Sequence, residues 1–264
     1  MMNSIRHHWP EYLIEAAGLG IFMVSACIFT LILEHPASPI RQSIGDPFLR
    51  RMLIGVAMGL TAISIIYSPW GKQSGAHINP SVTLTFFRLG KVKSWDAFLH
   101  NCTIRWRAGW CAFLCSGNWK CNRRPFRQLC RYSSGMGGVG VAFLGELVIS
   151  FVLMSVILIV SNTSSISRLT GLFAGILVAT YITLEAPLSG MSMNPARTFG
   201  SALPAKLWTN VWICFIAPPL GMHLASEVYL LVRGAGSVLC AKLRHQNDKR
   251  CIHCGYPGVM KARS

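Results

Sequence analysis

The chain has 264 residues, of which 52% are hydrophobic and only 13% are charged. The charged share is about half that of a typical soluble domain, and a mean hydropathy of +0.44 excludes a disordered chain. This composition predicts an integral membrane protein with one sizeable domain. We therefore interpret the formal net charge of +16 as basic loops and tails beside anionic lipid, and not as a nucleic-acid surface.

Four apolar stretches are long enough to cross a hydrocarbon core of about 30 Å as helices. They are residues 12–33, 139–160, 169–187 and 211–232. A fifth stretch, residues 53–67, reaches spanning length if Pro69 and Trp70 lie at the interface. The first stretch is longer than the apolar region of a signal peptide and does not follow a strongly basic start, so we interpret it as a true span.

Residues 99–135 interrupt this pattern, because they contain seven lysines and arginines and no acid. Each Lys or Arg at the centre of a lipid-facing helix costs about 2.5 to 3.5 kcal/mol. We interpret the segment either as a long basic cytoplasmic loop or as residues translated out of frame. Five of the ten cysteines also fall here, and we interpret all ten as reduced thiols rather than as a disulfide framework.

A short pattern occurs twice, 115 residues apart: residues 74–83 and 189–198 both read S-G-x-x-x-N-P-x-x-T. A G-x-x-x-G pair precedes each copy, which favours close helix packing. Short segments broken by glycine and proline at matching positions of two halves predict half-helices that enter the membrane from opposite faces. In each copy an asparagine is expected at the N-cap and a proline at the first helical position; these residues are Asn79, Pro80, Asn194 and Pro195.

The two half-helices are expected to point their positive ends at one another near the midplane of the bilayer. This field repels cations and hydronium, whereas the asparagine amides can donate hydrogen bonds to the oxygen of a neutral solute. Arg197 is expected to add a fixed cation at a constriction. His77 is expected to be a donor or cap in the pore loop, with a pH-sensitive gate as the alternative. Glu15 and Glu146 lie near the starts of apolar spans, and we expect backbone N–H groups of the re-entrant loops to be their partners.

The paired boxes resemble those of the aquaporin or major intrinsic protein family, whose signature is two Asn-Pro-Ala (NPA) motifs. Residues 194–197 match the second box, including Ala196, and the arginine that follows it. Residues 79–81 match the first box, except that Ser81 replaces alanine. The resemblance implies an all-α membrane fold, with a bundle of six transmembrane helices plus two re-entrant half-helices in an inverted 3+3 repeat. It also implies a homotetramer with a pore in every protomer and both termini in the cytoplasm.

On this basis the chain is one membrane channel domain with four parts. They are a first repeat half (residues 11–98), an anomalous basic and cysteine-rich segment in place of a third span (99–135), a second half (136–233) and a basic cytoplasmic tail (234–264). The expected function is a passive, multi-pass channel of the plasma or inner membrane for water or small uncharged solutes such as glycerol. No cofactor and no enzymatic activity are expected. The alternatives are a structural or adhesive protein of the same fold, or an inactive chain if the third span is lost.

The resemblance assigns Ile182 and Met191 to the selectivity constriction, together with a position that falls on Met58 or Gly59. Water-selective relatives have histidine at the first of these positions. Glycerol-selective relatives usually have aspartate at the position after the arginine, where this chain has Thr198. The constriction is therefore expected to be apolar, which favours small uncharged solutes without choosing between water and glycerol.

Cys251 and Cys254 form a weak candidate for half of a zinc site in the tail. Two thiolates are not four ligands, and a closed tetrahedral site would then need ligands from another chain. No bound metal is therefore assigned. The alternative is a disordered basic tail at the anionic membrane surface.

The coding DNA distinguishes the two interpretations of residues 99–135. If the segment is out of frame, we expect a single-base insertion or deletion near codons 100 and 135 to restore an apolar stretch of spanning length. Sequencing of the gene and translation of all three frames provides the check. A gene in which no such change yields an apolar stretch would leave only the basic loop.

Overall fold

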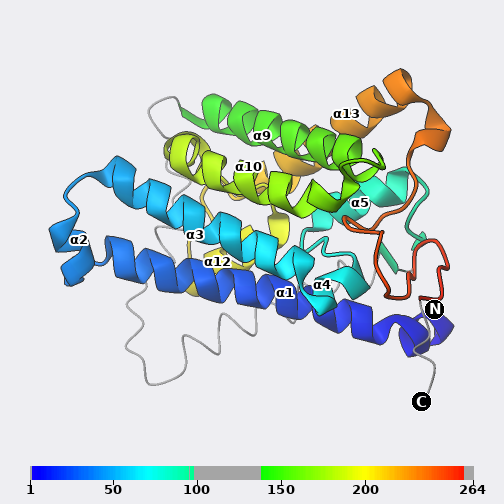
Figure 1. The fold of residues 1–264 in the computed structure, drawn as a ribbon. Helices are drawn as coiled ribbons and strands as arrows, with labels where there is room; N and C mark the ends of the chain where they lie inside the picture. The colour runs from blue at the N-terminus through cyan, green and yellow to red at the C-terminus, as the bar shows by residue number, and fades with distance from the viewer. Residues whose placement is uncertain (1, 95, 98–137, 259–264) are drawn as a thin grey trace, which may run out of the picture.

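The computed structural model describes residues 2–94, 96–97 and 138–258, and every regular element in these ranges is a helix (Figure 1). Five helices among the described residues are long and apolar enough to cross a membrane, the fourth of them taken together with the 3-10 turn that precedes it. They are α1 (Met2–Glu34), α3 (Pro47–Tyr67), α9 (Gly138–Ser161), α10 (Thr170–Leu184) and α13 (Trp212–Arg233). The five stretches predicted from hydropathy are thus helical, whereas the anomalous segment 99–135 lies outside the described residues.

Shorter helices connect the spans or enter between them. The connecting elements are α2 (Pro39–Ser43), α4 (Pro69–Ser74), α11 (Ala186–Ser189) and the single 3-10 turns η1 (Ser167–Leu169) and η2 (Ala235–Ser237). The two predicted half-helices are α5 (Pro80–Arg88) and α12 (Pro195–Ala205). Three helices begin at a proline that follows an Asp or Asn cap, because proline needs no N–H partner at the first position and the cap accepts a backbone N–H; the caps are Asp46, Asn79 and Asn194.

Glycine allows the spans to pack with their backbones in contact. A Cβ atom on Gly59 of α3 would lie 2.6 Å from the carbonyl oxygen of Gly175 on α10, and one on Gly175 would lie 2.7 Å from the oxygen of Gly59. Likewise, a Cβ on Gly221 of α13 would lie 2.3 Å from the carbonyl oxygen of Leu147 on α9. These close approaches join α3 to α10 and α9 to α13, as small residues do in membrane helix pairs.

The two half-helices run from a common meeting point toward opposite ends of the bundle (Figure 1). At the end of α5, Arg88 forms an ion pair of 3.1 Å with Glu227, near the C-terminal end of α13. Near the end of α12, Ala202 and Ala205 pack in one apolar cluster with Val211, which directly precedes α13. Because α5 reaches one end of α13 and α12 the other, the two N-termini face one another inside the bundle.

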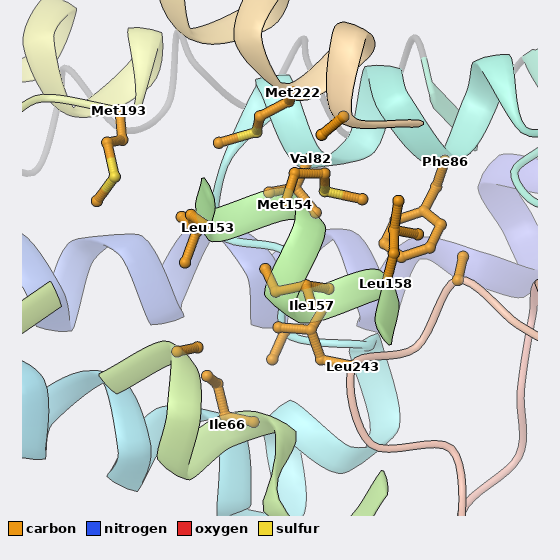
Figure 2. Packing of buried hydrophobic residues seen from close by; sticks show 14 of the residues in the cluster. Ile66, Val82, Phe86, Leu153, Met154, Ile157, Leu158, Met193, Met222 and Leu243 are labelled. Atoms are coloured by element: carbon orange, nitrogen blue, oxygen red, sulfur yellow. The ribbon is translucent and has the colours of Figure 1, made fainter. Parts of the chain in front are cut away.

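The main apolar core lies where α5 and α9 pack beside α13 (Figure 2). Phe86 of α5, Met154 and Leu158 of α9 and Met222 of α13 are all fully buried in this cluster. Leu243, far along the chain, packs into the same cluster. Close packing of such side chains supplies the van der Waals contacts that hold helices together in a membrane, so the core holds α5 in place.

The tail segment, which we define as residues 238–258, folds back over the end of the bundle where α1 begins (Figure 1). Arg250 forms an ion pair of 2.8 Å with the buried Glu11 of α1 and donates a hydrogen bond to the carbonyl oxygen of His7. The backbone N–H of Leu239 donates to the side chain of Asn162 at 2.7 Å. The expectation of a disordered tail is therefore wrong for these residues, because long-range polar contacts hold them on the bundle.

Replacement of Gly59 with alanine should weaken the contact between α3 and α10. The new Cβ would overlap the oxygen of Gly175, and overpacking of this kind typically costs about 1 to 3 kcal/mol. We expect a lower midpoint of thermal unfolding in detergent. The matched control is Gly140→Ala on α9, where a Cβ meets no atom within 4 Å and alanine favours the helix. A Gly59→Ala protein as stable as the control would contradict the proposed packing role.

Candidate pore

A cavity of about 780 Å³ extends along the inside of the bundle. Its walls come from α1, α3, α9 and α10 and from the loops that precede both half-helices. Six of the ten residues predicted to form the pore line it: His77, Asn79, Ile182, Met191, Asn194 and Arg197. The other four are buried at the first turns of α5 and α12; they are Pro80, Ser81, Pro195 and Ala196. The fold thus gathers residues from both halves around one space.

The two N-cap asparagines hold the half-helices together. The Oδ1 atom of Asn79 accepts from the N–H of Ser81 at 2.9 Å, and that of Asn194 accepts from Ala196 at 3.0 Å. The Nδ2 atom of Asn79 donates to the carbonyl oxygen of Met193 at 2.7 Å, and that of Asn194 donates to Ile78 at 2.8 Å. Each asparagine therefore caps its own helix and bonds to the loop of the other. Because an amide has two N–H donors, a second donor remains on each side chain for a solute in the cavity.

The loops before both asparagines adopt the same unusual backbone conformation. Ala76 and Ile78 have φ of 57° and 40°, and Met191 and Met193 have φ of 49° and 50°. Residues with a Cβ in this left-handed region cost about 1 to 3 kcal/mol each, and they persist only where surrounding contacts impose the conformation. The chain thus stores strain at equivalent positions of its two halves.

Two buried carboxylates hold these strained loops. Glu15 of α1 accepts hydrogen bonds from the backbone N–H groups of His77 at 3.1 Å and Ile78 at 2.5 Å. Glu146 of α9 accepts from the N–H groups of Ser192 at 2.5 Å and Met193 at 2.8 Å, and from the Ser189 hydroxyl at 2.9 Å. Both side chains thus bond to backbone N–H groups of the loops before the half-helices. Bonds to a charged acceptor are worth about 1.5 to 3 kcal/mol each, which is enough to offset the backbone strain.

Arg197 lies in the first turn of α12 and lines the cavity. Its Nη1 atom donates to the carbonyl oxygen of Met191 and lies 3.5 Å from that of Ser192. The loop therefore fixes the guanidinium at the cavity wall. Of the two positions left open by the sequence, Met58 lines the cavity, whereas Gly59 contacts α10.

The structure also places residues at the cavity that sequence reasoning missed. Leu243 of the tail segment is part of the lining, and the carbonyl oxygen of the neighbouring Ala241 lies 2.7 Å from Nε2 of His77. At the other end, the buried Arg50 pairs with Glu34 at 3.0 Å, and both line the cavity. The tail contact spans 164 residues, so no local pattern could have indicated it.

Replacement of Glu146 with glutamine should destabilise the loop before α12. The N–H groups of Ser192 and Met193 bond to different oxygens of the carboxylate, and glutamine replaces one of these oxygens with an NH₂ group that cannot accept. The unpaired buried N–H would cost about 1 to 3 kcal/mol, so we expect a lower unfolding midpoint in detergent. The control is Glu227→Gln, which removes only a partly exposed ion pair worth about 0 to 1 kcal/mol. Equal midpoints for the two variants would show that Glu146 does not hold the loop.

Comparisons with known proteins agree with this geometry. A family model for the major intrinsic proteins matches residues 3–229. Aquaporin NIP1-1 of Arabidopsis thaliana is 34% identical over 192 residues, which cover 68% of this chain and 62% of that protein. Aquaporin NIP3-1 of Oryza sativa subsp. japonica is 34% identical over 236 residues, which cover 84% of this chain and 67% of that protein. The chain thus spans somewhat less than two thirds of the length of the first relative.

A solved structure shows the same fold. The aquaglyceroporin from Plasmodium falciparum superposes with a TM-score of 0.63 at 19% sequence identity, covering 84% of this chain and 95% of that one. The match confirms the expected aquaporin-like architecture, in which inverted halves supply spans and half-helices. With two capped half-helices that meet inside the bundle and a family model that covers most of its length, the chain belongs to the major intrinsic protein family.

Proposed function

We propose that this chain is a passive transmembrane channel for water and small uncharged solutes such as glycerol, and that it excludes protons and other ions. The observation that carries the proposal is the meeting of two Asn-capped helix N-termini at the wall of one cavity. Relatives named aquaporins and a structural neighbour named an aquaglyceroporin support it. The family consists of channels and not enzymes, and no catalytic step is proposed.

The geometry supports ion exclusion by electrostatics. Each helix N-terminus carries about half a positive elementary charge, and α5 and α12 present theirs at the same place in the cavity. Arg197 adds a full positive charge to the same wall. A cation would lose its hydration and meet this positive field, whereas a water molecule loses little because Asn79 and Asn194 can donate to its oxygen. An oxygen that accepts from both amides is oriented so that it interrupts a proton relay.

Part of the cavity wall is apolar, which bears on the solutes. Met58, Ile182 and Met191 line the same cavity as Arg197. Apolar side chains beside fixed hydrogen-bond donors suit small solutes that combine a hydroxyl group with a carbon skeleton, as well as water itself. We therefore propose permeation by both water and glycerol-like molecules, without a strict choice between them.

The proposed setting is the plasma or inner membrane, with a multi-pass chain, cytoplasmic termini and a homotetramer. The bundle exposes large apolar side chains on its outer faces, among them Leu60, Leu144 and Ile176, which suit lipid or a neighbouring protomer. The start of α1 and the tail segment lie at the same end of the bundle, so they are on the same side of the membrane. A structural or adhesive role is not favoured, because such a role does not require a cavity lined by residues of both halves.

Stopped-flow measurements on proteoliposomes test the proposal. We expect osmotic water flux well above that of empty liposomes, with a low activation energy, measurable glycerol uptake and no proton conductance. Arg197→Val should raise proton leak and relax discrimination between solutes, because it removes the fixed charge from the cavity wall. The control is Arg168→Val, at an exposed position outside the cavity. Folded, helical protein that raises no flux above empty liposomes would refute the channel.

A further inference from the structure

Four side chains of the tail segment converge on one point: Cys240, His245, Cys251 and Cys254. Their ligand atoms all lie within 4.8 Å of one another. The Sγ atoms of Cys240 and Cys251 are 3.4 Å apart, and Sγ of Cys254 lies 3.8 Å from Nε2 of His245. A tetrahedral zinc ion with Zn–S bonds of about 2.3 Å holds its ligand atoms about 3.8 Å apart. We propose that these four residues bind one Zn²⁺ ion in a closed Cys₃His site.

The local backbone conformation places the sulfur atoms of Cys251 and Cys254 close together. Cys251 and Cys254 are two residues apart in a C-x-x-C turn, which is a common spacing for zinc ligands. The N–H of Gly255 donates to the carbonyl oxygen of Cys251 at 3.0 Å, and the N–H of Cys251 donates to Tyr256 at 2.7 Å. Gly255 has φ of 77°, a conformation that glycine adopts without strain. The turn thereby closes on itself and places both thiols on one side.

The fold supplies the two ligands that the pair lacks. Cys240 and His245 precede the C-x-x-C turn in the sequence. The fold of the tail segment brings their ligand atoms close to those of Cys251 and Cys254. No second chain is needed, contrary to the expectation from sequence. Three of the four ligands are at least half shielded from solvent, and Cys240 and Cys251 are buried. A complete set of four protein ligands is typical of a structural zinc site and not of a catalytic one.

The surroundings compensate the charge that the site would carry. Three thiolates and one Zn²⁺ ion sum to one negative charge. The fully buried Lys242 lies two residues after Cys240 in the sequence. Its Nζ atom also donates to the carbonyl oxygens of Lys72 at 2.9 Å and Arg250 at 2.5 Å. A buried cation next to an anionic cluster satisfies the requirement that buried charges be paired.

Two of the four ligands flank, in the sequence, the part of the tail that contacts the cavity. Residues 241–243 lie between Cys240 and His245 in sequence. The N–H of Leu243 donates to the carbonyl oxygen of Gly75 at 3.2 Å, and the carbonyl oxygen of Ala241 lies 2.7 Å from Nε2 of His77. Such a short segment has too little core to hold itself together, and a metal commonly supplies the missing stability. The zinc ion therefore fixes the tail as a wall of the cavity mouth beside His77.

Elemental analysis of the full-length protein, purified without chelators, tests the site. We expect about one Zn²⁺ per chain, and His245→Ala and Cys251→Ser should lower the content severalfold. The matched control is His253→Ala, because His253 lies between the two cysteines in sequence but outside the four ligands. A second control replaces the five cysteines between residues 102 and 130 with serine, and it should retain the metal. Loss of zinc in His253→Ala but not in His245→Ala would overturn the assignment.

Two further measurements on the unmodified sequence do not depend on the folding of a variant. Exchange of zinc for Co²⁺ should give the visible absorption of a tetrahedral thiolate site. Removal of the metal should increase amide hydrogen exchange in residues 238–258 and leave α9 unchanged. Absence of both metal and Co²⁺ uptake, or a disulfide between Cys240 and Cys251 in non-reducing peptide maps, would refute the proposal. These outcomes are independent of solute flux, so a non-conducting chain would still decide the question.

Discussion

The structure depends on the reciprocal hydrogen bonds between Asn79 and Asn194 and the opposite loops. Two helix N-termini that face one another carry like partial charges, so they repel unless other contacts hold them. Each asparagine offsets this repulsion with two kinds of hydrogen bond. Its oxygen accepts from the first turn of its own helix, and its NH₂ group donates to the opposite loop. The same arrangement leaves one donor on each amide directed away from the junction bonds. Stability and the capacity to receive a solute oxygen thus come from the same two side chains.

Contacts from the surrounding helices make the junction between the two half-helices rigid. Glu15 and Glu146 occupy equivalent places in the two halves and bond to the strained loops, so the loop conformation is fixed by charge rather than by flexible contacts. Gly59, Gly175 and Gly221 let the spans approach until their backbones are in contact. A cavity bounded by such contacts keeps its shape, because packed interiors do not deform continuously.

The tail segment adds a feature that the inverted repeat does not supply. It contacts the loop before α5 through His77 and Gly75. The symmetry of the two halves is therefore broken at one mouth, where Leu243 joins the cavity wall. Because the proposed zinc ligands hold this part of the tail together, the conformation of this mouth depends on whether the metal is bound.

The spans, the two half-helices and their asparagine caps can be predicted from the sequence, because hydropathy and capping are local properties that a few neighbouring residues decide. The sequence also indicates Glu15 and Glu146, since an acid in an apolar span requires a partner. Long-range packing is needed to show that Met58 and not Gly59 lines the cavity, that Leu243 joins the wall, and that Cys240 and His245 lie beside the cysteine pair. These facts depend on which helix faces turn inward and on how the chain folds back on itself, and packing between distant segments sets both.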